Sequence, residues 1–430
     1  MTAPGNQRDV DYLLIGGGLA SASAAEEIRK RDPNGSIVVV SSEAHLPYNR
    51  PPLSKEYLRG EINAEGIYGE GGIFVQLPDW YDTQRIEVVT GTHVSALDSR
   101  ARTARLENGS SIGFRTALIA TGGRPRSLQV SGMDLDGIHL LRTVDDANSI
   151  RQQLSAGRHL VVVGSGFIGM EVAASALMKG VTVTVIEPQP RPWVSLVSPE
   201  VSRFFEELFA GHGAVLRYGY TATEFVAGSD GHIAGVRIAP VDASHTTEDI
   251  SADMAVVGVG IQLNTEVAAS AGLEVDPRHG VVVDERLETA AAGIFAAGDV
   301  AAYPDPIAGR MHFEHWDNAI ASGQAAGANM AGGDEPYRHV PYFFSDQFDV
   351  SLNMLGYPSA SARTVIRGDT ASKQFMALYV EQDTLRAALM VNDDAQMDLL
   401  KDLIAASAPV SDPERLADAN FDLGSLMPGK

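Results

Sequence analysis

Two stretches of the chain share one pattern: an apolar strand runs directly into closely spaced glycines and then into a helix. The first begins with VDYLLIGGG at residues 10–18, continues through helix-forming residues and reaches a second apolar run at 36–40. The second, HLVVVGSGFIGMEVAASALMKGVTVTVIE at residues 159–187, repeats this order in one unbroken segment. Strand, Gly-rich turn, helix and strand form a βαβ unit, and in that context the glycines predict a dinucleotide-binding turn.

Each position of the first turn has a physical reason. Gly16 permits the tight turn, and Gly18 lets the backbone approach a pyrophosphate at the N-terminus of the helix. Ser21 occupies the third glycine position, where a small residue still allows the helix to pack closely on the strand. Past the second strand, Glu43 is the best candidate to bind a ribose hydroxyl, and Ser42 is the alternative.

The second turn has the full set of glycines, Gly164, Gly166 and Gly169. Its second strand ends in Glu187, about 20 residues past the glycines, where an acidic side chain binds an adenosine ribose. Because a carboxylate repels a 2′-phosphate, this site should prefer NAD to NADP. A single Gly-rich turn also occurs without a ligand, but two copies in complete βαβ units predict two dinucleotide cofactors in one chain.

The amino-acid composition excludes several kinds of redox site and argues against one class of partner. The chain contains no cysteine, which excludes a redox-active disulfide, a thiolate nucleophile and an iron–sulfur cluster held by the protein. Electron chemistry would therefore depend on a bound organic cofactor. The formal net charge of −22 argues against nucleic acid as a partner, because phosphate contacts need clustered Lys and Arg.

The sequence also predicts a cytoplasmic protein that does not bind membranes. Residues 1–10 lack the apolar core of a signal peptide, and no apolar run approaches the ~20 residues of a membrane helix. His312 and His315 lie three residues apart, but no cysteine or carboxylate-rich shell accompanies them, so we expect no metal site.

With these motifs in order, the chain resembles the FAD- and NADH-dependent ferredoxin reductases of bacterial oxygenase systems. These belong to the glutathione-reductase-like flavoproteins and are related to apoptosis-inducing factor; the disulfide-reductase branches need catalytic cysteines, which are absent here. The resemblance covers nearly the whole chain. It rests further on TALIATGGRP (116–125), DMAVVGVG (253–260), TAAAGIFAAGDVA (289–301), EHWDNA (314–319) and YFFSDQFDVSLNMLGYP (342–358).

The resemblance implies two sets of cofactor-binding residues. Asp299 would bind the ribityl chain of non-covalent FAD, and Trp316 would lie at the flavin edge unless it is a core tryptophan. The FAD set comprises Gly16, Gly18, Ser21, Glu43, Arg50, Lys55, Thr121, Gly122, Arg124, Asp299 and Trp316. The NAD(H) set comprises Gly164, Gly166, Ile168, Gly169, Glu187 and Gly260.

The proline-rich segment HLPYNRPPLSKEYL (45–58) ends with a lysine at the start of an expected helix. In the family, the arginine and lysine of such a segment reach the flavin, which here implies Arg50 and Lys55. Proline fixes φ, so the loop loses little entropy when it covers the ring system. The resemblance places Lys55 near flavin N5, paired with Glu171, and these two are the expected catalytic residues. Without it, Lys55 would be a solvated charge and Glu171 an ordinary first-turn carboxylate.

The predicted fold class is α/β, with two Rossmann-like dinucleotide-binding domains and a C-terminal α+β domain that contains an antiparallel sheet. Within that last domain, apolar runs at 373–380 and 385–392 predict paired strands, and a helix should follow from Asp394. Asn108-Gly109 predicts a type I′ hairpin turn. The expected boundaries are 1–118 and 252–332 for the FAD-binding domain, 119–251 for the NAD-binding domain and 333–430 for a C-terminal interface domain.

The resemblance implies a reductase that passes electrons from NADH through FAD to a [2Fe–2S] ferredoxin, which supplies a Rieske dioxygenase or a P450. Three alternatives stay open. One is a slow NADH oxidase with a signalling or binding role, as in apoptosis-inducing factor. Another is a reductase of rubredoxin or a different acceptor, and the third is a flavin-bound scaffold with a degenerate NAD site. Gln262, Leu263 and the stretch 62–78 depart from the family pattern.

Overall fold

The computed structural model describes residues 7–242, 246–305, 309–359 and 361–428, and they form two compact units. The first unit comprises Met1–Arg50, Asn63–Arg124 and Ile261–His339, and the second comprises Pro51–Ile62, Pro125–Gly260 and Val340–Lys430. The expected NAD-binding and C-terminal segments thus lie largely in one unit, together with the short piece that contains Lys55. The division into three domains stays a prediction.

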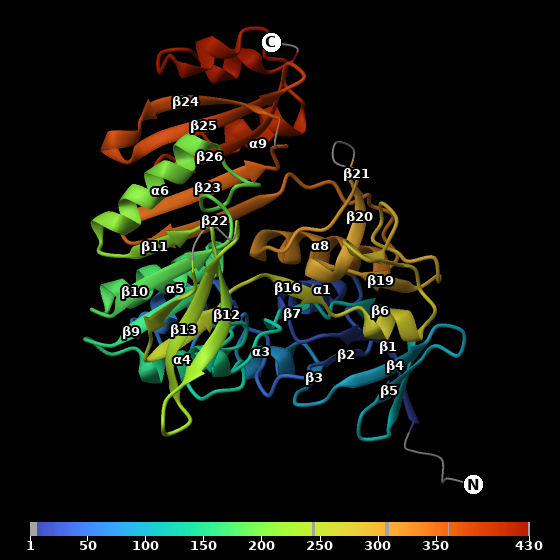
Figure 1. The fold of residues 1–430 in the computed structure, drawn as a ribbon. Coiled ribbons are helices and arrows are strands. Elements are labelled where there is room, and N and C mark those ends of the chain that lie inside the picture. Colours follow the sequence, from blue (N-terminus) through green and yellow to red (C-terminus); the bar gives the residue numbers. More distant parts are fainter. Residues whose placement is uncertain (1–6, 243–245, 306–308, 360, 429–430) are drawn as a thin grey trace. The chain divides into compact units, whose positions relative to one another are not determined.

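The first unit is built around a seven-stranded sheet (Figure 1). Its larger elements are β1 (Gln7–Ile15), α1 (Leu19–Arg31), β2 (Ile37–Val40), α3 (Pro78–Thr83), β3 (Ile86–Val89), β4 (Val94–Asp98), β5 (Thr103–Leu106), β6 (Ser111–Ile119), β19 (Ile294–Ala296) and α8 (Trp316–Met330). The strand order is β3-β2-β1-β6-β5-β4, with β19 paired to β6. The strands β1, β2, β3, β6 and β19 run parallel, whereas β4 and β5 add an antiparallel edge. The first βαβ unit is therefore confirmed.

Shorter elements complete this unit. They are β16 (Ile261–Leu263), α7 (Glu266–Ser270), β17 (Val275–Asp276), β18 (Gly280–Val282), the 3-10 helix η2 (Gly298–Val300), β20 (Ala301–Asp305) and β21 (Gly309–Met311). Strand β7 (Gly123–Pro125) carries the chain out of the unit and pairs with β16 where the chain returns.

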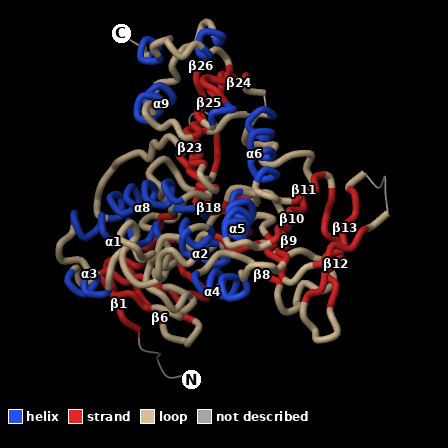
Figure 2. Tube along the Cα trace, turned by 90° about the vertical axis from the view of Figure 1, so that its left-hand side faces the viewer, coloured by secondary structure: helices blue, strands red, loops and turns tan. Residues whose placement is uncertain are grey.

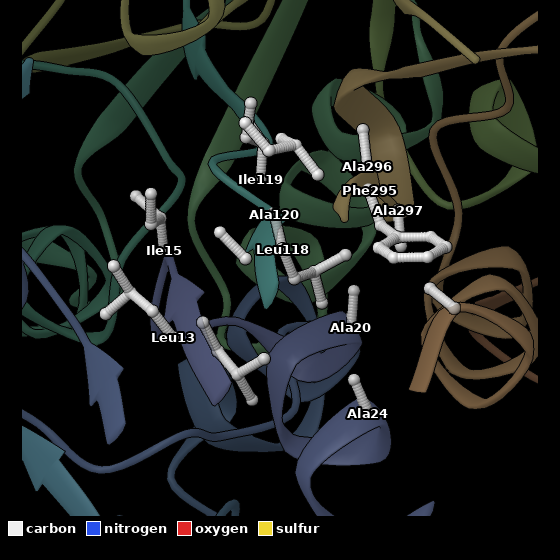
Figure 3. Close-up of a cluster of buried hydrophobic side chains, with 14 of the residues drawn as sticks. Leu13, Ile15, Ala20, Ala24, Leu118, Ile119, Ala120, Phe295, Ala296 and Ala297 are labelled. Carbon is white, nitrogen blue, oxygen red and sulfur yellow. The ribbon is translucent and has the colours of Figure 1, made fainter. Parts of the chain in front are cut away.

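The core of this unit lies between the sheet and the helix pair α1 and α8. The sheet is buried on both faces: Leu13 and Ile15 of β1 point to one side, and Leu118 of β6 points to the other with its partner Phe295 of β19 (Figure 3). The two helices approach closely because α8 presents glycine to α1. A Cβ on Gly323 would lie 2.4 Å from the Ala20 carbonyl oxygen, which is closer than any real contact.

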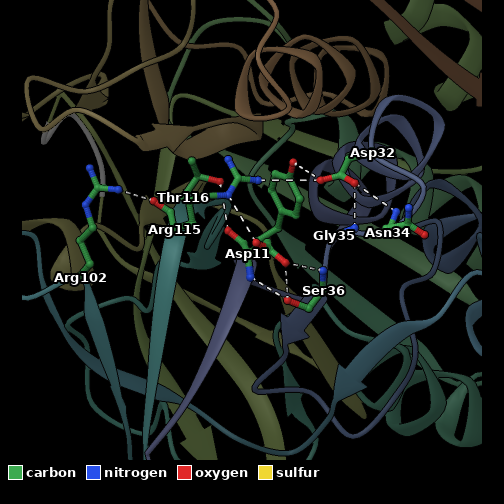
Figure 4. Close-up of polar contacts among 9 residues, drawn as sticks. Asp11, Asp32, Asn34, Gly35, Ser36, Arg102, Arg115 and Thr116 are labelled. Carbon is green, nitrogen blue, oxygen red and sulfur yellow. Dashed lines mark hydrogen bonds and ion pairs between the residues drawn. The ribbon is translucent and has the colours of Figure 1, made fainter.

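A polar network ties β1 to the segment before β2 (Figure 4). The backbone N–H and the hydroxyl of Ser36 both donate to Asp11 Oδ2 at 2.8 Å, and the Arg115 guanidinium lies 3.5 Å from Oδ1. The Ser36 donors and Arg115 together lower the pKa of Asp11, against the opposing effect of burial.

The second unit contains a parallel five-stranded sheet in the order β11-β10-β9-β15-β8 and an antiparallel three-stranded sheet, β12-β13-β14. Its first elements are η1 (Pro51–Ser54), α2 (Glu56–Arg59), β8 (Ile138–His139), α4 (Val144–Gln153), β9 (His159–Val163), α5 (Phe167–Met178), β10 (Thr182–Glu187), α6 (Pro199–Gly211), β11 (Val215–Tyr218), β12 (Tyr220–Ala227), β13 (Ile233–Pro240), β14 (Glu248–Ser251) and β15 (Met254–Val257). The second βαβ unit, β9-α5-β10, is confirmed.

The C-terminal part of this unit is an antiparallel five-stranded sheet in the order β22-β23-β26-β25-β24. Its elements are β22 (Tyr342–Gln347), β23 (Val350–Gly356), β24 (Arg363–Asp369), η3 (Thr370–Ser372), β25 (Gln374–Glu381), β26 (Thr384–Val391), α9 (Met397–Ala405), η4 (Pro413–Ala417) and η5 (Leu423–Leu426). The predicted hairpin is β25-β26, and the predicted helix is α9. Helix α6 packs on the same sheet, where Phe204 meets Phe375 (Figures 1 and 2). The predicted fold class is confirmed.

The hairpin predicted at Asn108-Gly109 is confirmed, because β5 and β6 pair antiparallel, but the predicted type I′ turn is wrong. Such a turn needs a positive φ at both central residues, and Gly109 has φ +85° but Asn108 is not in that region. Four residues, 107–110, connect β5 to β6. The Asn108 side-chain oxygen instead accepts from the backbone N–H of Ser110 at 3.0 Å, a local bond that sets a different turn.

Candidate functional site

The first Gly-rich turn forms an open backbone cradle. Gly16 has φ +119°, and a Cβ there would lie 2.2 Å from the Ala120 carbonyl oxygen, so only glycine fits. Gly18 precedes the 13-residue helix α1, and a Cβ there would meet no protein atom within 4 Å. The turn thus leaves space at a helix N-terminus, which suits the pyrophosphate of FAD. Ser21 is fully buried in α1, and its hydroxyl has no partner among the described residues.

The expected ribose-binding carboxylate and the expected flavin-loop arginine lie together. Arg50 NH2 donates to Glu43 Oε1 at 2.5 Å, and the Tyr48 hydroxyl donates to Glu43 Oε2. Burial lowers the pKa of Arg50, but Tyr48, Glu43 and Asp299 outweigh that effect and raise it overall. The Arg50 guanidinium thus donates both to the Glu43 carboxylate and, at 3.2 Å, to the Tyr48 hydroxyl. Ser42 is exposed, so both ribose candidates stay open.

The predicted FAD-binding residues Thr121, Gly122 and Arg124 all contact Asn264, near the paired strands β7 and β16. The Thr121 hydroxyl donates to the Asn264 carbonyl oxygen at 2.6 Å, and Gly122 accepts from the Asn264 backbone N–H at 2.9 Å. Arg124 donates to the Asn264 side chain at 2.5 Å and pairs with Glu266 at 2.8 Å. Asn264 was missed from the sequence because it follows the atypical pair at 262–263 and belongs to no motif.

Trp316 begins α8 and is half-buried. Its indole N–H donates to the Asn49 side-chain oxygen at 2.6 Å, and its ring meets Tyr68 edge to face with ring centroids 6.3 Å apart. Asn49 lies next to Arg50, and Tyr68 belongs to the atypical stretch 62–78. The structure therefore brings that stretch and the proline-rich segment onto one tryptophan.

The second Gly-rich turn repeats the geometry of the first. Gly164 has φ +103°, and a Cβ there would lie 2.3 Å from the Gly258 carbonyl oxygen. Gly166 caps the 12-residue helix α5, and a Cβ on Gly169 would lie 2.2 Å from the Gly164 carbonyl oxygen. Ile168 is 38% exposed, and Gly260 has open space around it. The turn has room for the pyrophosphate of NAD(H).

Glu187 is held by its own βαβ unit. The backbone N–H and hydroxyl of Ser165 both donate to Oε2 at 2.8 Å, and the Gln189 N–H donates to Oε1 at 2.9 Å. Burial raises the pKa of nearby Tyr218, and the negative charges of Glu206 and Glu187 raise it further. Ser165, the variable residue within the glycine motif, is a second site residue that the sequence did not reveal.

Lys55 and Glu171 form a buried ion pair. Lys55 Nζ lies 2.8 Å from Glu171 Oε2, and the two residues are only 4% and 5% exposed. Lys55 is the N-cap of α2, and Glu171 lies in the second turn of α5. The reading of Lys55 as a solvated surface charge is therefore wrong, because four-residue helix α2 turns the side chain inward onto α5.

Further polar groups surround this pair. Lys55 Nζ also donates to the Pro51 carbonyl oxygen at 3.2 Å and lies 5.5 Å from the centre of the Phe344 ring. The hydroxyl of Ser54 donates to Glu171 Oε2, and that of Ser345 donates to Oε1 at 2.7 Å. Among the described residues, two oxygen atoms accept from the three protons of Lys55, so one donor is left for a bound group.

His312, one of the two histidines considered as metal ligands, contacts a third histidine. His312 Nδ1 lies 3.3 Å from Nδ1 of His279, and its Nε2 lies 3.0 Å from Glu314. Within the described ranges, no three His, Asp or Glu side chains are grouped so that they could hold a metal ion. No helix in those ranges is both long and apolar enough to cross a bilayer.

Comparison with known proteins gives matches over nearly the whole chain. Residues 10–323 match the family described as pyridine nucleotide-disulphide oxidoreductase, and residues 342–427 match the reductase C-terminal domain. The ferredoxin–NAD(+) reductase component of the anthranilate 1,2-dioxygenase system from Burkholderia cepacia is 36% identical, covering 97% of this chain and 99% of that one. Rhodocoxin reductase from Rhodococcus erythropolis is 35% identical, covering 96% and 93%.

A solved structure extends the likeness to three dimensions. The covalent putidaredoxin reductase–putidaredoxin complex contains a chain with a TM-score of 0.90 at 31% identity, covering 97% of this chain and 98% of that chain. These matches confirm the resemblance drawn from the motifs. They also confirm an oxidoreductase whose cofactors are FAD and NAD(H).

Proposed function

Because the chain belongs to the pyridine nucleotide-disulphide oxidoreductase family, we propose that it passes electrons from NADH through FAD to a [2Fe–2S] ferredoxin that supplies an oxygenase. The observation that carries this proposal is similarity along the full length, including residues 342–427, to the reductase components of oxygenase systems. The chain has no cysteine, so it lacks the dithiol that disulfide reduction requires. The oxygenase would be a Rieske dioxygenase or a P450.

Two sets of residues would hold the cofactors. The turn at Gly16 and Gly18 fits the FAD pyrophosphate, with Glu43, Arg50 and Asp299 close by. When bound, FAD accepts a hydride from NADH and releases electrons singly, which a one-electron acceptor requires. The turn at Gly164 and Gly166 fits NAD(H).

Glu187 would select NADH. Its carboxylate is held in place by Ser165 and Gln189, so it can accept from ribose hydroxyls but would repel a 2′-phosphate. This selection supports NADH rather than NADPH as the electron donor.

Lys55 and Glu171 would act as a unit at the flavin. The ammonium group supplies positive charge and one unused donor, while Glu171 balances its charge so that it can remain buried. A cation beside the flavin favours its reduced, anionic form. The pair therefore supports hydride acceptance without a proton-transferring triad.

The test is NADH-driven reduction of cytochrome c by the FAD-loaded protein, with and without a panel of bacterial [2Fe–2S] ferredoxins. Strong stimulation by one ferredoxin is the expected result; free FAD and the FAD-free protein serve as controls. Fast flavin reduction without stimulation would contradict the acceptor but not the enzyme, and rubredoxin is then the next acceptor to add. Slow flavin reduction without stimulation would favour an oxidase of the apoptosis-inducing-factor kind. A cytoplasmic location, as the sequence predicts, completes the proposal.

A further inference from the structure

Glu171 accepts hydrogen bonds from two parts of the second unit. Lys55 and Ser54, from the piece 51–62, both bond Oε2, whereas Ser345 of β22 bonds Oε1 at 2.7 Å. Ser345 itself is held by Gln347, whose side-chain nitrogen donates to the serine hydroxyl at 3.1 Å. Both residues are only 1% exposed, so water does not substitute for these bonds.

The direction of the hydrogen bonds from Gln347 through Ser345 to Glu171 follows from which atoms carry protons. An ionised carboxylate only accepts, so Ser345 must give its one hydroxyl proton to Glu171. The serine oxygen must then accept from Gln347, which turns the amide nitrogen toward it. The amide oxygen points away, and that buried Gln347 oxygen has no partner among the described residues. A buried acceptor without a partner destabilises a fold, and such groups concentrate where function requires them.

Strand β22 is aligned along helix α5. Its odd-numbered residues from Phe343 are buried on one face, since the strand alternates half-buried and buried positions. Phe343 contacts Phe167, the first residue of α5, at a ring-centroid distance of 4.7 Å, and Ser345 reaches Glu171 one helical turn later. The same strand thus touches the glycine turn of the NAD site and the carboxylate of the ion pair.

We propose that Ser345 and Gln347 are positioning residues for the Lys55–Glu171 pair. Their hydrogen bonds run in one direction and hold the Glu171 carboxylate on the Lys55 ammonium group. This inference rests on the proposed role of that pair in flavin reduction, and it gives the reductase C-terminal domain a part in the chemistry. Ser345 acts through Glu171, and Gln347 acts through Ser345.

The experiment compares Ser345→Ala, Ser345→Thr, Gln347→Leu and the control Ser351→Ala, all in FAD-loaded protein. Ser351 lies on neighbouring strand β23, outside the chain of hydrogen bonds. The first measurement is single-turnover flavin reduction by NADH across pH 5–9, which needs no ferredoxin. The second is the flavin midpoint potential over the same range with a chemical reductant, which needs no NADH.

Ser345→Ala should slow flavin reduction roughly tenfold, the rate equivalent of one hydrogen bond to a charged group. The flavin midpoint potential should change as well, because the Glu171 carboxylate is then held less firmly on the Lys55 ammonium group. Gln347→Leu should act in the same direction and more weakly, Ser345→Thr should restore both, and Ser351→Ala should change neither.

A lower melting temperature of Ser345→Ala with unchanged rate, potential and pH profile would overturn the proposal, because it would show a purely structural role. Failure of the proposed function looks different: the wild type itself would not be reduced by NADH. The flavin midpoint potentials then still decide, since a potential in Ser345→Ala that differs from the wild type supports the positioning role and equal potentials contradict it.

Discussion

The two Gly-rich turns are nearly the same in backbone and differ in what surrounds them. Gly16 and Gly164 share a positive φ and a close approach to a carbonyl oxygen, that of Ala120 in one turn and Gly258 in the other. The motif determines this local geometry because only glycine tolerates it. Everything that distinguishes the turns comes from the side chains beyond the motif.

The expected ribose carboxylates show the first difference. Glu187 is held within its own βαβ unit, by Ser165 and Gln189. Glu43 is held by Tyr48 and Arg50, which lie in the proline-rich segment. The NAD turn is thus complete by itself, whereas the FAD turn depends on the following loop.

The fifth residue after the middle glycine shows the second difference. It is Ser23 in α1 and Glu171 in α5, and both are buried. A buried serine needs at most a hydrogen bond, but a buried carboxylate needs a compensating charge. Lys55 supplies that charge, so the NAD helix carries a polar centre that the FAD helix lacks.

Of the substitutions that test this difference between the helices, removal of Lys55 should have the largest effect on stability and on flavin reduction. Lys55→Met leaves an unpaired carboxylate inside the protein, and we expect it to lower the free energy of unfolding by about 3–5 kcal/mol. It should also slow flavin reduction by NADH. The matched change in the first helix, Ser23→Ala, leaves no unpaired charge and should change the free energy of unfolding by about 1 kcal/mol or less. Urea denaturation and stopped-flow flavin absorbance measure the two effects.

The double variant Lys55→Met with Glu171→Leu separates stability from chemistry. Because no unpaired charge remains, it should regain most of the lost stability while flavin reduction stays slow. A double variant that recovered the wild-type reduction rate would remove the pair from the reaction.

Replacing the glycine of each tight turn by alanine tests which cofactor that turn binds. Gly16→Ala combines a strained φ with a clash, and we expect loss of FAD and roughly 2–4 kcal/mol of stability. Gly164→Ala should retain FAD and raise the KM for NADH at least about tenfold, a loss of about 1.4 kcal/mol in binding. Flavin absorbance after gel filtration and steady-state kinetics measure these outcomes.

Gly18→Ala is the control for the FAD turn. Its Cβ meets no protein atom, so the melting temperature of the FAD-free protein should not change although FAD binds more weakly. If Gly164→Ala released FAD as readily as Gly16→Ala does, the assignment of the two turns would be wrong.

Cofactor selectivity should follow Glu187. Replacing it in Glu187→Arg removes the repulsive charge and adds an attractive one, so the NADH-to-NADPH ratio of kcat/KM should fall by about 10- to 100-fold. Glu43→Gln, at the equivalent place in the FAD turn, should leave that ratio unchanged and weaken FAD retention. An unchanged ratio in Glu187→Arg would exclude Glu187 from the nucleotide site.

The elements that the sequence predicted correctly are those that nearby residues determine. Both βαβ units, the hairpin β25-β26 and the start of a helix at Lys55 were predictable because residues close together in the chain determine them. The Lys55–Glu171 pair came from a family resemblance, since no local rule joins residues so far apart in the chain.

The partners of the site residues were not predictable. Asn264 between Thr121 and Arg124, and Ser345 on Glu171, depend on where strands meet in three dimensions. The type I′ turn at Asn108 was wrong for a local reason: a backbone bond from the Gly109 N–H to the Leu106 carbonyl oxygen, together with the Asn108 side-chain bond, sets a different turn. Motifs therefore predicted where the cofactors would bind, and tertiary packing determined which side chains contact the predicted site residues.

The smallest expected effect is on stability in acid, and it concerns the residue five positions before each tight-turn glycine. This residue is Asp11 before Gly16 and His159 before Gly164. The Ser36 N–H and hydroxyl lower the pKa of Asp11, so its stabilising contribution is present above the pKa of the unfolded chain, about 3.9, and disappears as pH falls below it. Burial lowers the pKa of His159, so the unfolded chain binds its proton first and stability falls as pH drops below about 6.5.

The second unit should therefore respond to mild acid before the first. We expect His159→Gln to flatten the decline of the melting temperature between pH 7 and 5, while Asp11→Asn leaves that range unchanged. At neutral pH, Asp11→Asn should lower the free energy of unfolding by less than about 1 kcal/mol, because its ion pair with Arg115 is half exposed. Calorimetric melting at half-unit pH steps measures both variants. An equal slope in His159→Gln and the wild type would show that a different group sets the acid response of the NAD-binding unit.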